Sequence, residues 1–139
     1  MNKGWIMENR KCIAVLTEKP SLDYQSGILK GIYRSAFSHD VNVAVFCVTS
    51  TRSDEAYQIG EMVIFSLLGD YSRFSGVIYL PDTIDYSMRD TLITEKLIAA
   101  SRKIKIPVVT IDGNYDEFPC FLSDDSEPIQ FLVDHLSAG

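Results

Sequence analysis

Two short apolar segments with a helical pattern between them constrain the fold more than any other feature of the sequence. The segments Phe74 to Pro81 and Lys105 to Asp112 are rich in β-branched residues and lack a 3.6-residue period, which is typical of strands buried on both faces. Between them, six residues recur at helical spacing, and all but Lys96 are apolar: Met88, Leu92, Ile93, Lys96, Leu97 and Ala100. Strand, amphipathic helix and strand predict a right-handed crossover between two parallel neighbours.

The same alternation continues on both sides of this unit. Further strands are predicted at 12–16, 41–48 and 120–122. A helix capped by Ser21 or Asp23 follows the first strand, a second begins at Asp54, and a last one follows Asp124 and Asp125. The fold class is therefore α/β, a three-layer open parallel sheet of about five strands, Rossmann-like, with helices on both faces.

Apolar stripes indicate which helix faces turn inward. The first helix carries Ile28, Leu29, Ile32, Tyr33, Ala36 and Phe37. Gly27 and Gly31 are expected to let this helix approach the sheet closely. The inward positions of the last helix are predicted to be Ile129, Leu132, Val133 and Leu136.

Composition bounds the class of protein. The chain has 139 residues and a net charge of −6, so it is long enough for one domain, and its charge argues against direct contact with nucleic acid. No apolar run approaches the ~18 residues of a membrane span, and Trp5 to Met7 is too short for a signal peptide. Three cysteines lie in apolar strand-like runs, and we expect buried, reduced thiols: Cys12, Cys47 and Cys120. These features predict a cytoplasmic protein with a 1–11 extension before a 12–139 domain.

Polar residues gather where the predicted strands end. Parallel strands deliver their carboxyl ends to one edge of the sheet, and ligands of open α/β sheets bind there. We therefore expect a small-molecule site at this edge, although solvated loop residues would show the same pattern. The candidate ligand-binding residues are Glu18, Ser21, Asp23, Ser50, Asp82, Asp112, Asn114 and Asp124.

No catalytic or metal-binding signature is found. His39 and His135 lie on different predicted helices without a second ligand at helical spacing, so no metal site is predicted. No Gly-rich phosphate loop and no nucleophile motif occurs, which predicts a non-enzyme without a cofactor. A receiver domain of two-component signalling is the alternative of the same size. Asp82 could be its phosphate acceptor, but strand five ends Leu122-Ser123-Asp124, without the lysine that such domains use.

The second predicted helix has more apolar surface than one sheet can cover. Beyond a stripe for the sheet, it carries Tyr57, Ile64, Phe65 and Leu68. Soluble monomers avoid exposing such a contiguous patch. Either the connection 69–74 folds back over it or a second subunit packs on it, and we expect a homodimer.

The segment from Cys12 to Gly139 resembles the N-terminal lobe of the lactose-repressor and periplasmic-binding-protein type of sensor domain. Three segments carry the resemblance, in the same order and spacing: Ser75 to Pro81, Ile106 to Asp112, and Asp124 to Glu127 with Val133 to Leu136. The resemblance implies a sensor whose two lobes close around a small-molecule effector, a sugar or another metabolite, and whose dimer passes the signal on. It also implies that a second lobe and an output domain lie outside this sequence.

A closer likeness involves Tyr57 to Glu61, Ile64 to Leu68 and Asp82 to Ile84. These segments resemble a branch of such sensors that is fused to GGDEF-type diguanylate cyclases and stands first in the chain. The resemblance implies a bacterial signalling protein of that kind. The alternative is the effector domain of a LacI-type transcription regulator. Sugar-binding members often carry Arg after the strand-four Asp, whereas Gly113 follows Asp112 here.

Overall fold

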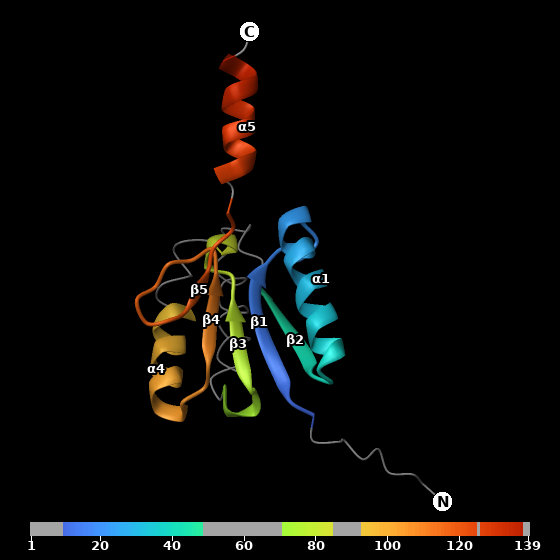
Figure 1. Ribbon diagram of the computed structural model, residues 1–139. Helices are drawn as coiled ribbons and strands as arrows, with labels where there is room; N and C mark the ends of the chain where they lie inside the picture. Colours follow the sequence, from blue (N-terminus) through green and yellow to red (C-terminus); the bar gives the residue numbers. More distant parts are fainter. Residues whose placement is uncertain (1–9, 49–70, 85–92, 125, 138–139) are drawn as a thin grey trace, which may run out of the picture.

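A parallel sheet forms the centre of the molecule (Figure 1). The computed structural model describes residues 10–48, 71–84, 93–124 and 126–137. Within them the strands are β1 (Cys12–Glu18), β2 (Asn42–Val48), β3 (Gly76–Tyr79), β4 (Val108–Ile111) and β5 (Cys120–Phe121). Their order is β2-β1-β3-β4-β5, and every neighbouring pair is parallel. The predicted α/β fold with a five-stranded parallel sheet is confirmed.

Helices flank the sheet on opposite faces (Figure 1). Helix α1 (Asp23–Ser38) packs with Val15 and Leu80 through Leu29. Helix α4 (Glu95–Ile104) packs on the other face, where Leu97 joins a core with Leu16. Because side chains of a strand alternate between faces, β1 supplies both cores from adjacent positions. Short 3₁₀ helices η1 (Tyr71–Arg73) and η2 (Pro81–Thr83) lie on either side of β3.

Helix α1 departs from its predicted start and stripe. Its N-cap is Leu22, without a side-chain hydrogen bond, so the prediction of a Ser21 or Asp23 cap is wrong. Tyr33 and Phe37 are exposed, Phe37 at 91%, because the apolar arc of α1 is wider than its contact with the sheet. The expected close approach at its two glycines is also wrong, since a Cβ at Gly27 or Gly31 would meet nothing within 4 Å.

Helix α5 (Ser126–Ser137) stands away from the sheet (Figure 1). None of its residues is buried. The prediction that its apolar stripe packs inward is wrong, because the helix leaves the carboxyl edge of the sheet and points outward from it. The four stripe residues are all more than half exposed: Ile129, Leu132, Val133 and Leu136.

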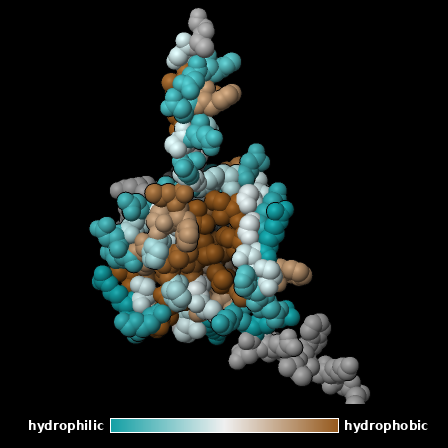
Figure 2. Space-filling model, in the orientation of Figure 1, coloured by the Kyte–Doolittle hydropathy of each residue, from teal (hydrophilic) through white to brown (hydrophobic). Residues whose placement is uncertain are grey.

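An apolar hollow of about 680 Å³ lies beside α1, and Figure 2 shows apolar side chains gathered over the middle of the sheet. Its lining includes Ile13, Ile32, Ala36 and Ile78. A neighbouring hollow of about 360 Å³ continues it toward Val109 of β4. One face of β3 and β4 is therefore open beside α1 in this structure.

Four non-glycine residues have left-handed backbone angles: Lys19, Asp40, Lys105 and Asp112, with φ of 40°, 56°, 58° and 55°. Each lies one or two residues after the end of a strand or helix, where the chain must change direction.

The three cysteines are unpaired and half-buried, so the expectation of full burial is wrong. Burial still raises the pKa of the Cys47 thiol.

Candidate functional site

Six residues from four segments line a polar hollow of about 590 Å³ at the carboxyl edge of the sheet. They are Tyr24, Gln25, Asp82, Thr83, Asp112 and Ser123. The chain passes from β1 to β2 on one side and then returns to place β3 on the other side of β1. This reversal of strand order creates the crevice in which open α/β sheets bind ligands. The hollow therefore lies where the topology predicts a binding site.

The apolar hollow beside α1 is larger, but it lies at the opposite end of the strands. Its lining residues Lys11, Ile13 and Val41 stand where β1 and β2 begin. Convergent polar groups distinguish a ligand site from an uncovered apolar surface. We therefore assign the candidate site to the smaller, polar hollow, on its chemistry and not on its volume.

Asp112 is held at the hollow by three hydrogen bonds from two other segments. It follows β4 with a left-handed backbone, and its Oδ1 accepts a hydrogen bond from the backbone N–H of Ser123 at 2.6 Å. Its Oδ2 accepts bonds from the Ser123 hydroxyl, at 2.7 Å, and from the Tyr24 phenol. The Tyr24 bond and then the Ser123 bonds hold the pKa of Asp112 below its usual value of 3.8. The carboxylate is thus ionised at neutral pH.

The same hydrogen bond shifts the pKa of Tyr24 in the opposite direction. Partial burial, followed by the hydrogen bond and charge of Asp112, raises the pKa of the Tyr24 phenol from 10.0 to about 12. The phenol stays protonated and donates to Asp112. Tyr24 lies in the first turn of α1, so this bond joins the start of α1 to the end of β4.

Gln25 brings a buried amide to the hollow. Its exposed fraction is 7%, and among the residues that the structure describes no group forms a hydrogen bond with its side chain. Buried polar groups nearly always have a hydrogen-bond partner. The Gln25 amide is therefore a candidate for contact with a ligand in the hollow.

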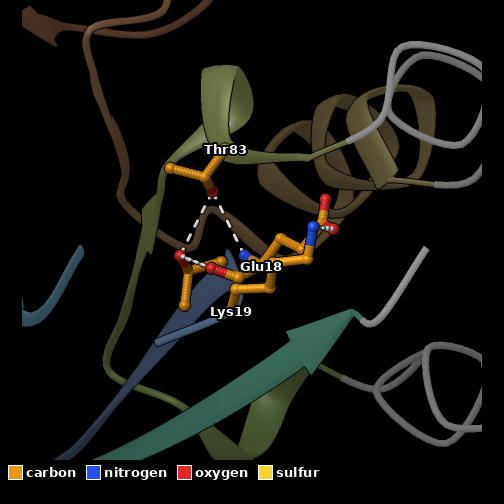
Figure 3. A network of polar contacts seen from close by, with 4 residues as sticks. Glu18, Lys19 and Thr83 are labelled. Carbon is orange, nitrogen blue, oxygen red and sulfur yellow. Dashed lines mark hydrogen bonds and ion pairs between the residues drawn. The ribbon is translucent and has the colours of Figure 1, made fainter. Parts of the chain in front are cut away.

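Thr83 fixes η2 against the end of β1 (Figure 3). Its hydroxyl donates to the Leu80 carbonyl at 2.7 Å and accepts from the backbone N–H of Glu18 at 3.1 Å. The hydroxyl of Thr17 lies 3.1 Å away. These contacts hold the segment that carries Asp82 beside the segment that leads into α1.

Glu18 stands at the expected edge but does not line the hollow. Its side chain is buried, and its Oε1 lies 3.3 Å from Nζ of Lys19 (Figure 3). The Glu18 carboxylate therefore forms an ion pair with its neighbour at the end of β1. Its contact with a ligand stays a prediction.

The other predicted site residues are distributed as follows. Asp82 and Asp112 line the hollow together. Ser21, Asp23, Asn114 and Asp124 are exposed near the ends of the same strands and do not line it. Asp124 accepts bonds from the backbone N–H and hydroxyl of Ser126, the first residue of α5, and these bonds lower its pKa. Five predicted positions lie outside the described residues: Ser50, Tyr57, Ile64, Phe65 and Leu68.

Sequence reasoning missed four residues that line the hollow: Tyr24, Gln25, Thr83 and Ser123. Thr83 and Ser123 adjoin the predicted Asp82 and Asp124, so their strand-end position was a usable signal. Tyr24 and Gln25 lie within the first helical turn, where polar residues usually face water.

The lining favours a hydrogen-bond donor as the bound group. Two carboxylates, Asp82 and Asp112, line the hollow, and within the described ranges no Lys or Arg does so. An anionic group would meet like charges there.

The described residues contain no group of three His, Cys, Asp or Glu side chains that could hold a metal ion. None of the helices in that part of the chain is long and apolar enough to cross a membrane.

Comparison with known proteins gives a fold and no close relative. No family model matches the chain, and no curated protein sequence matches it. Among solved structures, the lac repressor dimer bound to operator and the anti-inducer ONPF is similar over 95% of this chain and 36% of its own, at 21% identity and a TM-score of 0.61. The LacI family regulator CCPA from Weissella paramesenteroides, with bound glucose, matches 91% of this chain and 41% of its own, at 20% identity and a TM-score of 0.58.

A transport protein shares the same fold. The periplasmic binding protein of the arabinose ABC transporter from Shewanella sp. ANA-3, bound to arabinofuranose, matches 91% of this chain and 41% of its own, at 16% identity and a TM-score of 0.56. The present chain thus spans about two fifths of each of these proteins. At such identities the likeness shows the fold alone. The chain has the fold of a lobe of LacI-type regulators and periplasmic binding proteins.

Proposed function

We propose that this chain is the N-terminal lobe of a two-lobe ligand-sensing domain, with the polar hollow as its half of the ligand site. The observation that carries the proposal is the buried amide of Gln25, which has no hydrogen-bond partner among the described residues and lines the hollow together with Asp112, at the crevice where strand order reverses. A site of convergent polar groups in this position is the common ligand site of open α/β folds. The effector is a sugar or another small metabolite.

The exposed apolar stripe of α5 supports the proposal of a second lobe. Ile129, Leu132, Val133 and Leu136 form one apolar face on a helix with no buried residue. An amphipathic helix gains its stability by burying such a face. We infer that this face packs into the second lobe, which lies outside the present sequence. Closure of the lobes around the effector then signals through a dimer that uses Tyr57, Ile64, Phe65 and Leu68.

Two parent proteins fit this lobe. The structural neighbours favour an effector-binding domain of a LacI-type transcription regulator, since two of those described are such regulators. The extended segment Tyr57 to Leu68 favours the sensor of a GGDEF-type diguanylate cyclase. We propose the regulator first and the cyclase sensor second. The three unpaired cysteines suit a reducing compartment, and we propose the cytoplasm.

Nuclear magnetic resonance of the ¹⁵N-labelled chain tests the proposal. The chain is titrated with a library of sugars and other metabolites that begins with glucose, sucrose and L-arabinose. We expect amide shifts at Tyr24, Gln25, Asp112 and Ser123 with weak affinity, because one lobe can bury only about half of a ligand, against the ~70–90% of complete small-molecule sites.

Matched variants and calorimetry complete the test. Asp112→Asn should abolish the shifts, whereas Asp116→Asn, at an exposed turn residue, should leave them unchanged. Absence of shifts at the hollow with every compound contradicts the proposed site. A submicromolar affinity measured by calorimetry contradicts the half-site reading.

A further inference from the structure

Among the described residues, only neutral groups bond the carboxylate of Asp112. Its three hydrogen bonds come from the Tyr24 phenol and from the backbone N–H and hydroxyl of Ser123. These bonds hold the pKa of Asp112 below its usual value of 3.8 and keep the carboxylate ionised, but they bring no positive charge to it. In the described part of the chain Asp112 forms no ion pair. A negative charge therefore remains at the wall of the hollow.

One oxygen of this carboxylate has room for a further hydrogen bond. A carboxylate oxygen has about two lone-pair sites, and Oδ1 accepts a single bond, from the backbone N–H of Ser123. Because Asp112 lines the hollow, a donor on a ligand can bond Oδ1 without breaking any bond that the structure shows.

The Gln25 amide is a second acceptor at the same hollow, and it points independently to a ligand. Its side chain is 7% exposed, lines the hollow and has no hydrogen-bond partner in the part of the chain that the structure describes. An ammonium group has three N–H donors and no acceptor, so it can bond Oε1 of Gln25 and Oδ1 of Asp112 at once. A single hydroxyl has one donor and can bond only one of these oxygens.

The charges around these two acceptors also favour a cation. Burial, then Asp112 and lastly the charge of Asp82 raise the pKa of Tyr24 to about 12, so both carboxylates act on the same wall. Within the described ranges no Lys or Arg lines the hollow. Lys19 follows β1 at this edge, but its Nζ lies 3.3 Å from Oε1 of Glu18 (Figure 3). The local field therefore attracts positive charge.

We propose that the hollow selects a cationic ligand, an amino sugar or another primary amine, whose ammonium group bonds Oδ1 of Asp112 and the amide oxygen of Gln25. Tyr24 and Ser123 are positioning residues that keep the carboxylate ionised and oriented. The volume of about 590 Å³ lies within the ~300–1,000 Å³ of sites for small molecules. The inference rests on the proposed function and narrows its ligand class to amines.

Matched ligands test the charge. The full ¹⁵N-labelled chain is titrated with D-glucosamine, D-glucose and N-acetyl-D-glucosamine at slightly acidic pH, where the amine is protonated. Ethanolamine and ethylene glycol repeat the comparison without a sugar ring. We expect each amine to bind several-fold more tightly than its neutral counterparts, with shifts at Gln25 and Asp112. Added sodium chloride should weaken the amines and not the neutral compounds, because salt screens charge.

The outcomes separate this inference from the proposed function. Neutral compounds that bind as tightly as the amines at these amides overturn the inference and leave the proposed site intact. Absence of shifts with both amines also overturns it, while the sugar library still tests the site. Calcium chloride that shifts the same amides and competes with D-glucosamine would assign the hollow to a metal ion and overturn the amine.

Variants test the two acceptors. Asp112→Asn keeps the shape of the side chain and removes its charge, so it should abolish D-glucosamine binding. Asp116→Asn removes a charge at an exposed turn residue that does not line the hollow and should leave binding unchanged. Gln25→Leu should weaken D-glucosamine binding several-fold in a chain that thermal melting shows to be folded. D-glucosamine that binds Asp112→Asn or Gln25→Leu as tightly as the parent chain overturns the inference.

Discussion

The carboxylate of Asp112 accepts two hydrogen bonds from Ser123, one from the backbone N–H at 2.6 Å and one from the hydroxyl at 2.7 Å. This pair closes the polar hollow on the side of β4 and β5, and Tyr24 closes it on the side of α1. With Asp82 and Thr83 after β3, the hollow is lined by side chains that follow four different strands of the sheet.

The lowered pKa of Asp112 predicts a loss of stability in acid. The group contributes stability above its unfolded value of 3.8, and the contribution disappears as the pH falls through its lower folded value. The thermal midpoint of Asp112→Asn should therefore lie below that of the parent chain at neutral pH, and the difference should narrow in acid. Thermal melts followed by circular dichroism across this range measure it. A difference that stays constant with pH contradicts the prediction.

Gln25→Leu should stabilise the ligand-free chain. The buried amide has no described partner, and an unsatisfied buried polar group costs about 1–3 kcal/mol, which an apolar side chain of similar size avoids. Urea unfolding measures the change. Gln130→Leu is the control, because the Gln130 amide is exposed and donates to Asp134 at 2.9 Å, so no gain is expected. A marked loss of stability in Gln25→Leu would show that the amide is satisfied in solution.

Gly113→Ala should destabilise the chain. A Cβ at this buried position would lie 1.9 Å from Cγ of Pro81, so the ends of β3 and β4 must separate. Overpacking of this kind costs roughly 1–3 kcal/mol. Gly27→Ala is the matched control, since nothing lies within 4 Å of its Cβ and alanine in a helix is favoured over glycine by about 0.5–1 kcal/mol. Chemical denaturation of both variants gives the comparison, and equal effects would contradict the close contact.

Phe65→Glu tests the proposed dimer. We expect light scattering to show a dimer of the parent chain at high concentration and a folded monomer of the variant. Phe37→Glu changes a residue that is 91% exposed on α1 and should leave the mass unchanged. A parent chain that is monomeric at every concentration, together with a Phe65→Glu variant that unfolds, would place Phe65 in the core.

The directions of the strands were predictable from the sequence, and so was the position of Asp82 and Asp112 at the same edge of the sheet. Both residues follow apolar runs that only buried strands explain, and parallel strands end at one edge. The burial of Gln25 could not be predicted, because polar residues in the first turn of a helix usually face water. The path of α5 was also beyond the sequence pattern. Amphipathicity shows that Leu132 and Val133 share a face, but it does not name the surface that this face meets.

The residues with left-handed backbone angles differ in how well they should tolerate substitution by glycine. At Lys105, the C-cap of α4, glycine would relieve a backbone cost of roughly 1–2 kcal/mol and remove only an exposed side chain. At Asp112 the same replacement would ease the backbone equally and erase the carboxylate that Tyr24 and Ser123 share. Glycine at Asp112 would also remove the hydrogen bonds by which this carboxylate stabilises the fold. Glycine should therefore be tolerated at Lys105 and not at Asp112, although both residues have the same backbone conformation.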